Sequence, residues 1–243
     1  MKSFALISCL LFSLGFLPTY AQDTALLEAE QARGILTGNN GVQWTVSVTG
    51  ANNNARFIAT SQGGKIYAEV LEPEEAKGRK YLAEAKGNMW FWKPGLSRPV
   101  SVSKRQRLSG DAAIGDIAST SFVKGYKVVS QEASEFEGEA ATVYTMKSNS
   151  LTDTYAQIKY WVTKKGNLGK YTEFYAKSGT LLRSSTMEYQ NTANGRPFLS
   201  KMVIKDNTKI ITLSFRDVKI GAFPERMFER DYLGGPKPKR PGK

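Results

Sequence analysis

The sequence contains no histidine and only one cysteine among its 243 residues. Without histidine, the chain cannot form an imidazole acid–base catalyst, a Ser-His-Asp or Cys-His unit, or a histidine-ligated zinc, copper or haem site. The sequence also lacks a phosphate-binding loop, EF-hand spacing and a carboxylate pair placed for catalysis. We therefore expect a protein that is not an enzyme and that carries no cofactor and no metal.

The first residues have the pattern of a secretory signal peptide. Lys2 supplies the positive charge, and the apolar run Phe4–Leu17 is too short to span a membrane. Thr19 and Ala21 then form a small-residue cleavage site. No later apolar run is long enough to cross a bilayer. We predict that residues 1–21 are a signal peptide that is removed, and that the mature chain is exported as a soluble protein.

The single cysteine, Cys9, lies inside this segment, where Leu6-Ile7-Ser8-Cys9 resembles a lipoprotein cleavage site. Cleavage before Cys9 would leave almost no apolar stretch ahead of the site and would keep Leu10–Leu17 on the mature protein. We therefore expect the mature chain to begin at Gln22, without lipid and without cysteine. Such a chain has no disulfide and no thiolate nucleophile, so its stability comes from packing alone.

Apart from its positive charge, the composition is that of an ordinary globular protein. Hydrophobic residues make up 41% and charged residues 23% of the chain, and 34 Lys and Arg against 22 Asp and Glu give a net charge of +12. Removal of the signal leaves 243 − 21 = 222 residues, enough for one β domain with a substantial core. We predict a single domain over residues 22–233 and a disordered basic tail over 234–243.

Periodicity predicts one short helix followed by many strands. Asp23–Arg33 begins with capping-type residues and has Leu and Ala at helical spacing, which indicates an amphipathic helix. Leu108–Lys124 and Pro224–Phe228 each indicate a helical turn or two. Short alternating runs rich in β-branched and aromatic residues predict strands over Val42–Thr49, Asn54–Ser61, Lys65–Glu72, Arg79–Ala85, Asn88–Lys93, Val100–Ser103, Tyr126–Gln131, Ala140–Ser148, Ala156–Thr163, Gly169–Ala176, Leu181–Gln190, Pro197–Asp206 and Lys209–Ile220.

The spacing of these strands, roughly 8–12 residues, is typical of an antiparallel sandwich or barrel. Turn signals such as Lys164–Asn167 and Lys177–Gly179 separate consecutive strands. A single sheet built in this way must close, or its apolar face must be covered, because open edges and exposed apolar faces promote association. The few helices are the expected cover.

The most unusual local pattern is Trp90-Phe91-Trp92, which makes both faces of one predicted strand apolar. One interpretation is that one face packs in the core while the other lies beneath a loop or helix. The other interpretation is that one face lines a ligand cavity. Strand parity does not decide whether Trp90 or Trp92 points inward.

The other strands supply more apolar faces than a thin sheet with few helices needs, which predicts an apolar cavity for lipid. Its candidate lining residues alternate with polar residues along most of these strands. They are Trp44, Val46, Phe57, Ile66, Val70, Trp90, Trp92, Tyr160, Leu213 and Phe215.

A set of basic residues surrounds the Trp/Phe strand and has three interpretations. They could form a solvated face, attract an anionic membrane or acidic partner, or bind single-stranded nucleic acid. We expect no nucleic acid partner, because the chain is exported and has no nucleic-acid recognition motif. We predict that the set forms a docking surface and does not hold cargo; it comprises Lys77, Arg79, Lys80, Arg98, Lys104, Arg105 and Arg107.

Four short motifs lie between the N-terminal helix and the long run of strands. They read Gly78-Arg79-Lys80-Tyr81-Leu82, Asn88-Met89-Trp90-Phe91-Trp92-Lys93-Pro94, Arg105-Gln106-Arg107-Leu108-Ser109-Gly110-Asp111 and Gly115-Asp116-Ile117. Together with the signal peptide and the helix, they make the chain similar to the outer-membrane lipoprotein-sorting protein family, which is related to the LolA and LolB carriers of bacteria with two membranes. The resemblance covers residues 22–233 and is strongest over 79–117.

The resemblance implies a mainly β fold with a few short helices, in which a single antiparallel sheet curls into an unclosed β-barrel, or half-barrel, with a helical lid. It also implies a periplasmic carrier that binds lipid or lipoprotein acyl chains in an apolar cavity, for transport or sorting to the outer membrane. Expected partners are an inner-membrane transporter or an outer-membrane acceptor, with transient contact to an anionic membrane. The competing hypothesis is a non-catalytic β-rich adaptor with a filled interior, docking on an envelope protein or a membrane transporter.

Overall fold

The computed structural model describes residues 23–36, 39–50, 54–84, 88–102, 121–150, 153, 155–206 and 209–234. The predicted signal peptide, most of the predicted helical segment Leu108–Lys124 and the basic tail after Gly234 lie outside these residues. These three assignments remain predictions.

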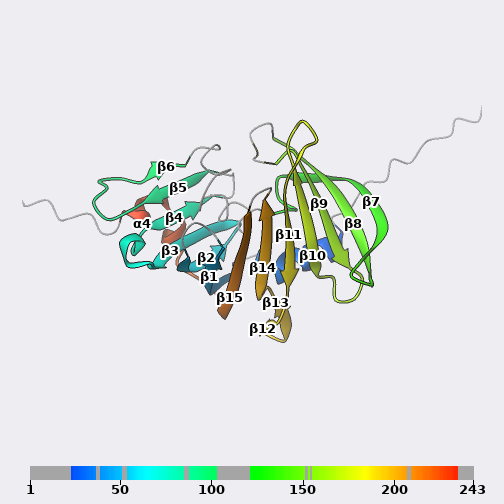
Figure 1. The fold of residues 1–243 in the computed structure, drawn as a ribbon. Helices are drawn as coiled ribbons and strands as arrows, with labels where there is room; N and C mark the ends of the chain where they lie inside the picture. Colours follow the sequence, from blue (N-terminus) through cyan, green and yellow to red (C-terminus); the bar gives the residue numbers. More distant parts are fainter. Residues whose placement is uncertain are drawn as a thin grey trace, which may run out of the picture.

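Thirteen antiparallel strands form one sheet that is mainly assembled from hairpins (Figure 1). The two edge strands of the sheet come from the middle of the sequence. In spatial order the strands are β6 (Val100–Ser101), β5 (Met89–Trp92), β4 (Lys80–Ala83), β3 (Lys65–Glu72), β2 (Ala55–Gln62), β1 (Gly41–Thr49), β15 (Lys209–Gly221), β14 (Lys201–Asp206), β11 (Leu181–Glu188), β10 (Gly169–Tyr175), β9 (Gln157–Thr163), β8 (Glu139–Ser148) and β7 (Tyr126–Phe136).

The pairing of β1 with β15 brings the first and last strands together in the middle of the sheet. Two wings extend from this pair, one made of β2–β6 and the other of β14 and β11–β7 (Figure 1). The two edge strands, β6 and β7, are not paired with each other among the described residues, so the sheet is open. This confirms the expected fold class, a mainly β protein with a single unclosed antiparallel sheet.

Helix α1 (Thr24–Ala32) lies against β9, β10 and the short strand β13 (Arg196–Phe198), and we call the face of the sheet that it covers the inner face (Figure 1). The Asp23 side chain caps the helix by accepting a hydrogen bond from the backbone N–H of Ala25 at 2.9 Å. Leu26 and Ala29 are buried and belong to one large inner-face core, which also contains residues from β1, β8–β11, β14 and β15. The expected N-terminal helix is therefore part of the core, and it covers one wing of the sheet.

The C-terminal segment packs on the opposite, outer face of the sheet. The 3-10 helix η2 (Glu225–Phe228) and the helix α4 (Arg230–Leu233) bury Phe228 and Leu233 against Tyr67 of β3 and Leu82 of β4. A further 3-10 turn, η1 (Glu74–Ala76), connects β3 to β4. The β2–β6 wing is therefore covered on its outer face by the end of the chain.

One predicted strand, Pro197–Asp206, divides into β13 (Arg196–Phe198) and β14. β13 pairs with β12 (Asn191–Ala193) around the two-residue turn Asn194-Gly195, in which both residues have positive φ. The Asn191 side chain also donates to the backbone carbonyls of Leu199 and Phe215, at 2.7 and 2.8 Å. The turn residues Asn194 and Gly195 therefore allow β12 and β13 to form a small hairpin that is separate from the main sheet.

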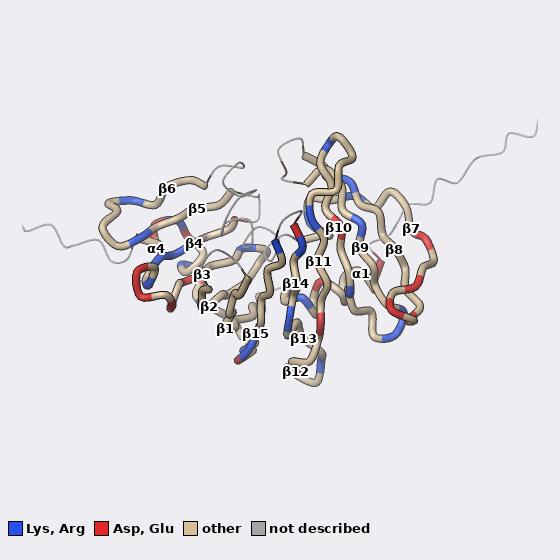
Figure 2. Tube along the Cα trace, viewed as in Figure 1, with Lys and Arg blue, Asp and Glu red and all other residues tan. Residues whose placement is uncertain are grey.

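The edge strand β7 continues to Phe136, beyond the predicted end at Gln131, because its backbone pairs with β8 along its whole length. Figure 2 shows acidic residues gathered along this hairpin. They are Glu132, Glu135, Glu137 and Glu139. A charged edge of this kind disfavours pairing with another chain.

Candidate functional site

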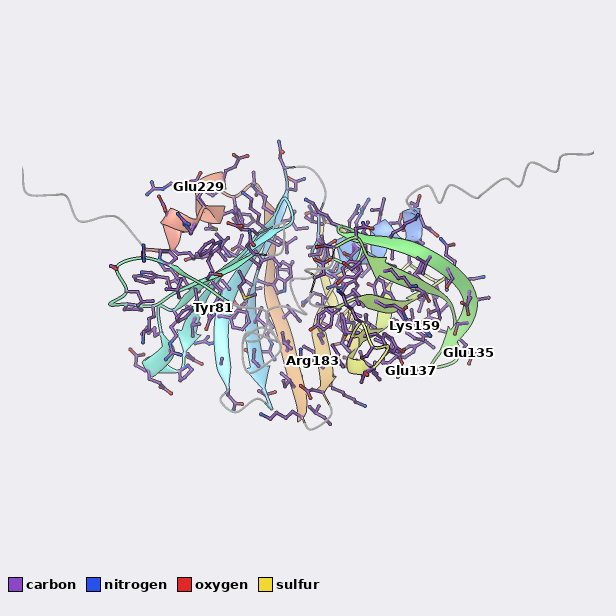
Figure 3. The ribbon with its side chains drawn as sticks, turned by 90° about the horizontal axis from the view of Figure 1, so that it is seen from above. Tyr81, Glu135, Glu137, Lys159, Arg183 and Glu229 are labelled. Atoms are coloured by element: carbon purple, nitrogen blue, oxygen red, sulfur yellow. The ribbon has the colours of Figure 1, made fainter. Side chains whose placement is uncertain are left out.

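An apolar pocket, which we call the inner pocket, lies on the inner face of β1–β5 and β15. Alternate residues of paired strands project to the same side of a sheet, so the period-two pattern of the sequence brings their side chains together here. Tyr81, which β4 contributes, is labelled in Figure 3. The described lining consists of Arg33, Ile35, Trp44, Val46, Phe57, Ala59, Ser61, Ile66, Ala68, Tyr81, Ala83, Met89, Leu213 and Phe215.

One row of side chains across the strands explains the hollow. Trp44 lies opposite Ala59 in the β1–β2 ladder. Ala59 lies opposite Ala68, and Ala68 lies opposite Tyr81, in the next two ladders. Two methyl side chains between two large aromatic ones leave unfilled space that the rings border. The Tyr81 ring also packs against Phe91 of β5, with 5.1 Å between centroids.

The segment after α1, Arg33–Leu36, closes one end of the inner pocket, and we call it the connector. Gly34 lies so close to the Trp44 ring that an added Cβ atom would be 2.0 Å from Trp44 Cη2, and its φ is +90°. The Ser61 hydroxyl donates a hydrogen bond to the Gly34 carbonyl at 2.6 Å. Glycine is needed here, because any side chain would meet the indole and because positive φ disfavours other residues.

A buried ion pair holds the start of the connector. The Arg33 guanidinium bonds to the Glu30 carboxylate, and the two side chains are only 1% and 3% exposed. Glu30 also accepts hydrogen bonds from the Ser121 hydroxyl at 3.0 Å and from the Phe122 backbone N–H at 2.8 Å. The guanidinium lies 3.6 Å from the centroid of the Phe122 ring. The sequence does not reveal this cluster, since Glu30 and Phe122 are 92 positions apart.

The inner pocket is small in this conformation, with a volume of about 80 Å³. Sites that hold drug-sized ligands measure about 300–1,000 Å³. A long acyl chain therefore needs the pocket to widen. The connector is the part of the described wall that no sheet ladder holds, so it is the part that can move with the least disruption.

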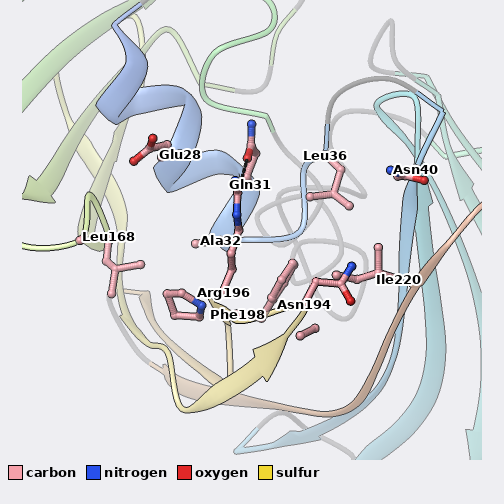
Figure 4. Close-up of a pocket in the computed structure, with 13 residues that line it drawn as sticks. Glu28, Gln31, Ala32, Leu36, Asn40, Leu168, Asn194, Arg196, Phe198 and Ile220 are labelled. Carbon is pink, nitrogen blue, oxygen red and sulfur yellow. Dashed lines mark hydrogen bonds between the residues drawn. The ribbon is translucent and has the colours of Figure 1, made fainter.

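A wider groove of about 600 Å³ lies on the other side of the connector (Figure 4). Arg33 and Ile35 line the inner pocket, whereas Ala32 and Leu36 line the groove. The groove has a mixed wall, so it suits a hydrocarbon chain less well than the inner pocket does. Its described lining consists of Glu28, Gln31, Ala32, Leu36, Asn40, Gly166, Leu168, Ala193, Asn194, Arg196, Pro197, Phe198 and Ile220.

The structure brings together six of the residues that the sequence suggested for a cavity. These are Trp44, Val46, Phe57, Ile66, Leu213 and Phe215, which all line the inner pocket. Val70 is buried and lies opposite Phe57, on the same face of the sheet. Sequence reasoning did not select Ala59 and Ala68 as lining residues, because it sought large apolar side chains, whereas small residues create the space. It also did not select Tyr81 and Met89.

The placement of Trp90 and Trp92 corrects the expectation that one of them faces the cavity. Both pack against the outer-face cluster beneath η2 and α4, and Met89 lines the inner pocket instead. The Trp90 indole donates to the Glu84 carboxylate at 3.0 Å. The Trp92 indole donates to the Leu96 carbonyl at 2.9 Å. Residues two apart on a strand share a face, and the C-terminal segment covers that face.

Tyr160 also lies apart from the inner pocket. It is fully buried in the wing made of β7–β11, where its ring packs edge-on against Phe122 with 4.9 Å between centroids. Burial raises the pKa of its phenol well above the ordinary value. The period-two pattern correctly places Tyr160 on the inner face of the sheet. Helix α1 and Phe122 fill the space above its ring, so Tyr160 lines no part of the inner pocket.

The described members of the predicted basic surface lie on or near the β2–β6 wing, as Figure 2 shows for this part of the chain. Lys77 pairs with Glu74 at 3.1 Å, and Lys80 lies 5.5 Å from the Trp92 ring centroid. Arg79 donates to the backbone carbonyl of Glu75. Arg98 is exposed. The other predicted members, Lys104, Arg105 and Arg107, lie outside the described residues.

Two further features were sought in the part of the chain that the structure describes, a metal-binding cluster and a membrane-spanning helix. The described residues contain no group of three or more Cys, Asp or Glu side chains that could hold a metal ion. No helix in the described part of the chain is long and apolar enough to cross a membrane.

Two comparisons concern the sequence. A family model with the description "Uncharacterized protein" matches residues 63–234, which include every strand from β3 onward. A search of the curated proteins finds no match to this chain.

Two solved structures share the fold of the whole described domain. A LolA superfamily protein from Nitrosomonas europaea is 24% identical, with a TM-score of 0.69 over 86% of this chain and 99% of that one. A domain from Vibrio parahaemolyticus that is assigned to outer membrane lipoprotein sorting is 18% identical, with a TM-score of 0.70 over 86% of this chain and 97% of that one. The resemblance inferred from the sequence is thereby confirmed at the level of the fold.

Proposed function

The chain belongs to the protein family whose model matches residues 63–234, and we propose that it is a periplasmic carrier of lipid or lipoprotein acyl chains. The observation that carries this proposal is the inner pocket, an apolar hollow on the covered face of an open sheet. The fold shared with lipoprotein-sorting structures supports the same role. The signal peptide pattern of residues 1–21 supports the periplasmic location.

The chemistry of an acyl chain fits the wall of the inner pocket. Each CH₂ group that leaves water for an apolar cavity contributes about 0.8 kcal/mol, so a long chain contributes on the order of 10 kcal/mol. Such binding depends on apolar area and needs no strong polar anchor. Cargo can therefore be released when an acceptor offers an equally apolar environment.

Loading requires a change in the connector. The present volume of about 80 Å³ accepts only a short part of a chain. Displacement of Gly34 from the Trp44 ring, with loss of the Ser61 hydrogen bond, would join the inner pocket to the groove lined by Ala32 and Leu36. We propose this joined space as the loaded form of the site.

We propose that the basic surface docks the carrier during loading and delivery, on an anionic membrane, an inner-membrane transporter or an outer-membrane acceptor. Lys77 and Arg98 are exposed on the wing that forms most of the inner pocket. Docking there would bring the pocket close to the membrane surface. Sorting to the outer membrane is the delivery route that the shared fold favours.

The small size of the pocket favours a second candidate function, a β-rich adaptor that docks on an envelope protein and carries no cargo. Native mass spectrometry of protein purified from periplasm separates the two functions. The carrier should retain lipid, or should bind a fluorescent fatty acid saturably at micromolar concentration after delipidation. A stably folded protein that retains no lipid and binds no probe would be an adaptor.

A further inference from the structure

Trp44 combines deep burial with an unused hydrogen-bond donor. The residue lines the inner pocket and is only 8% exposed. Its indole Nε1 is buried and has no hydrogen-bond partner among the residues that the structure describes. An indole nitrogen can only donate, and a buried donor without an acceptor is unfavourable. An acceptor that entered the pocket would therefore be bound at this position.

The polar groups beside Trp44 do not supply that acceptor or compete for it. The Ser61 hydroxyl donates to the Gly34 carbonyl at 2.6 Å. The Arg33 guanidinium is paired with the Glu30 carboxylate. An ionised carboxylate is a poor ligand for this position, because its charge would be buried beside an arginine that already has a counter-ion. A neutral acceptor fits better.

We infer that the inner pocket binds acyl esters or amides, with the neutral carbonyl oxygen accepting a hydrogen bond from Trp44 Nε1. This inference rests on the proposed carrier function and adds a chemical class, since it separates acyl esters and amides from plain hydrocarbon. The attached chain would lie along the apolar side chains of Val46, Phe57 and Phe215. Trp44 is thus a specificity residue as well as part of the apolar wall.

Competition binding of two ligands of equal size, methyl decanoate and tridecane, tests this inference. Each ligand displaces a fluorescent acyl probe from the full-length mature protein. The alkane has carbon atoms where the ester has two oxygens, and this difference in apolar surface is the same for every variant. The ratio of ester affinity to alkane affinity should therefore be about three- to tenfold higher for the wild type than for Trp44→Phe, the range expected for one net hydrogen bond. Trp161→Phe, on the outer face where Trp161 packs against Tyr171, should leave the wild-type ratio unchanged.

Nuclear magnetic resonance of the indole ¹⁵N–H groups gives a readout on the wild-type protein. The chain has four tryptophans, so four indole signals are expected. Methyl decanoate should shift the Trp44 signal downfield, whereas tridecane should not produce that shift. The Trp90 and Trp92 signals should stay in place, because their indoles already have acceptors in Glu84 and Leu96.

The outcomes separate this inference from the function on which it rests. The same ratio of ester to alkane affinity in the wild type and in Trp44→Phe, with no downfield shift of Trp44, would show that the carbonyl is not recognised, while the carrier function would stand. Binding of neither ligand would overturn both. If Trp44→Phe does not fold, the indole shift of the wild-type protein still decides.

Discussion

Gly34 is the residue on which closure of the inner pocket depends most directly. Its φ of +90° and the nearby Trp44 ring leave no room for a side chain. Gly34→Ala should destabilise the protein by about 1–2 kcal/mol through the backbone and by a further 1–3 kcal/mol or so through the collision. Gly63→Ala is the matched control, with φ of +60° and no atom within 4 Å of the added Cβ. Equal losses in urea unfolding would contradict the close packing of the connector.

Tyr160 gives a prediction for alkaline pH. Burial raises the pKa of its phenol in the folded state, so its contribution to stability is complete below the ordinary pKa of about 10 and is lost as the pH rises through the folded pKa. The free energy of unfolding should fall above about pH 10, because the unfolded chain ionises this tyrosine first. Tyr160→Phe should lessen the slope by about 1.4 kcal/mol per pH unit. Urea unfolding of both proteins at pH 8, 10 and 11 measures how the free energy of unfolding depends on pH. Identical slopes for the wild type and Tyr160→Phe would refute the prediction.

At the residue scale, sequence parity predicts faces but not their contacts. The alternation through Trp44, Val46 and Phe57 identified side chains that do share the inner pocket. For Trp90 and Trp92, we expected one of the two to face the cavity, which is wrong, because residues two apart on a strand share a face and both pack on the outer face. Both tryptophans lie on the outer face, where they pack in the same cluster as Leu233 of the C-terminal segment, more than 140 positions later in the chain. Contacts at that separation leave no local pattern.

Helix α1 is the element that covers the β9–β10 part of the inner face, and Glu30 fixes its end through contacts with Arg33, Ser121 and Phe122. Glu30→Gln would leave the buried Arg33 without its counter-ion, and loss of one member of such a pair costs about 3–5 kcal/mol. Glu28→Gln, on the exposed side of the same helix, should cost less than about 1 kcal/mol. Chemical denaturation of both variants compares the two effects. A small loss for Glu30→Gln would mean that α1 is held by apolar packing alone.

At the element scale, local patterns predicted most of the fold. Lys65–Glu72 was predicted with the bounds that β3 has, and the Asp23–Arg33 helix is α1 with its cap. The division of Pro197–Asp206 depends on Asn191, whose side chain bonds to Leu199 and Phe215. The order of strands was not predictable in detail, because the β1–β15 ladder joins residues such as Gly41 and Gly221.

At the scale of the whole molecule, acidic residues gather on the β7–β8 hairpin, whereas the described part of the basic surface lies near β3–β6, where acidic residues such as Glu74 lie beside it (Figure 2). Charge reversal of the exposed Lys77 and Arg98 should weaken association with anionic vesicles by about tenfold or more, since each near-surface cation contributes about 1 kcal/mol. Affinity for an acyl probe should stay unchanged, because apolar contact is little affected by screening.

The control for this prediction is charge reversal of Lys164 and Lys165, which are exposed in the β9–β10 turn and change the net charge equally. Vesicle co-sedimentation at low and physiological salt measures both pairs. Equal weakening by both pairs would mean that net charge alone drives association. Loss of probe affinity in the Lys77 and Arg98 variant would place these residues at the cavity mouth.

Saturable acyl binding in the inner pocket is the central claim, and a pocket-filling variant tests it most directly. Ala68→Leu puts a larger side chain into the hollow between Trp44 and Tyr81, and Ala133→Leu makes the same change at an exposed position on β7. Titration with a fluorescent fatty acid should give saturable micromolar binding to the wild type and to Ala133→Leu, and at least tenfold weaker binding to Ala68→Leu. Unchanged affinity in a folded Ala68→Leu protein would contradict the claim.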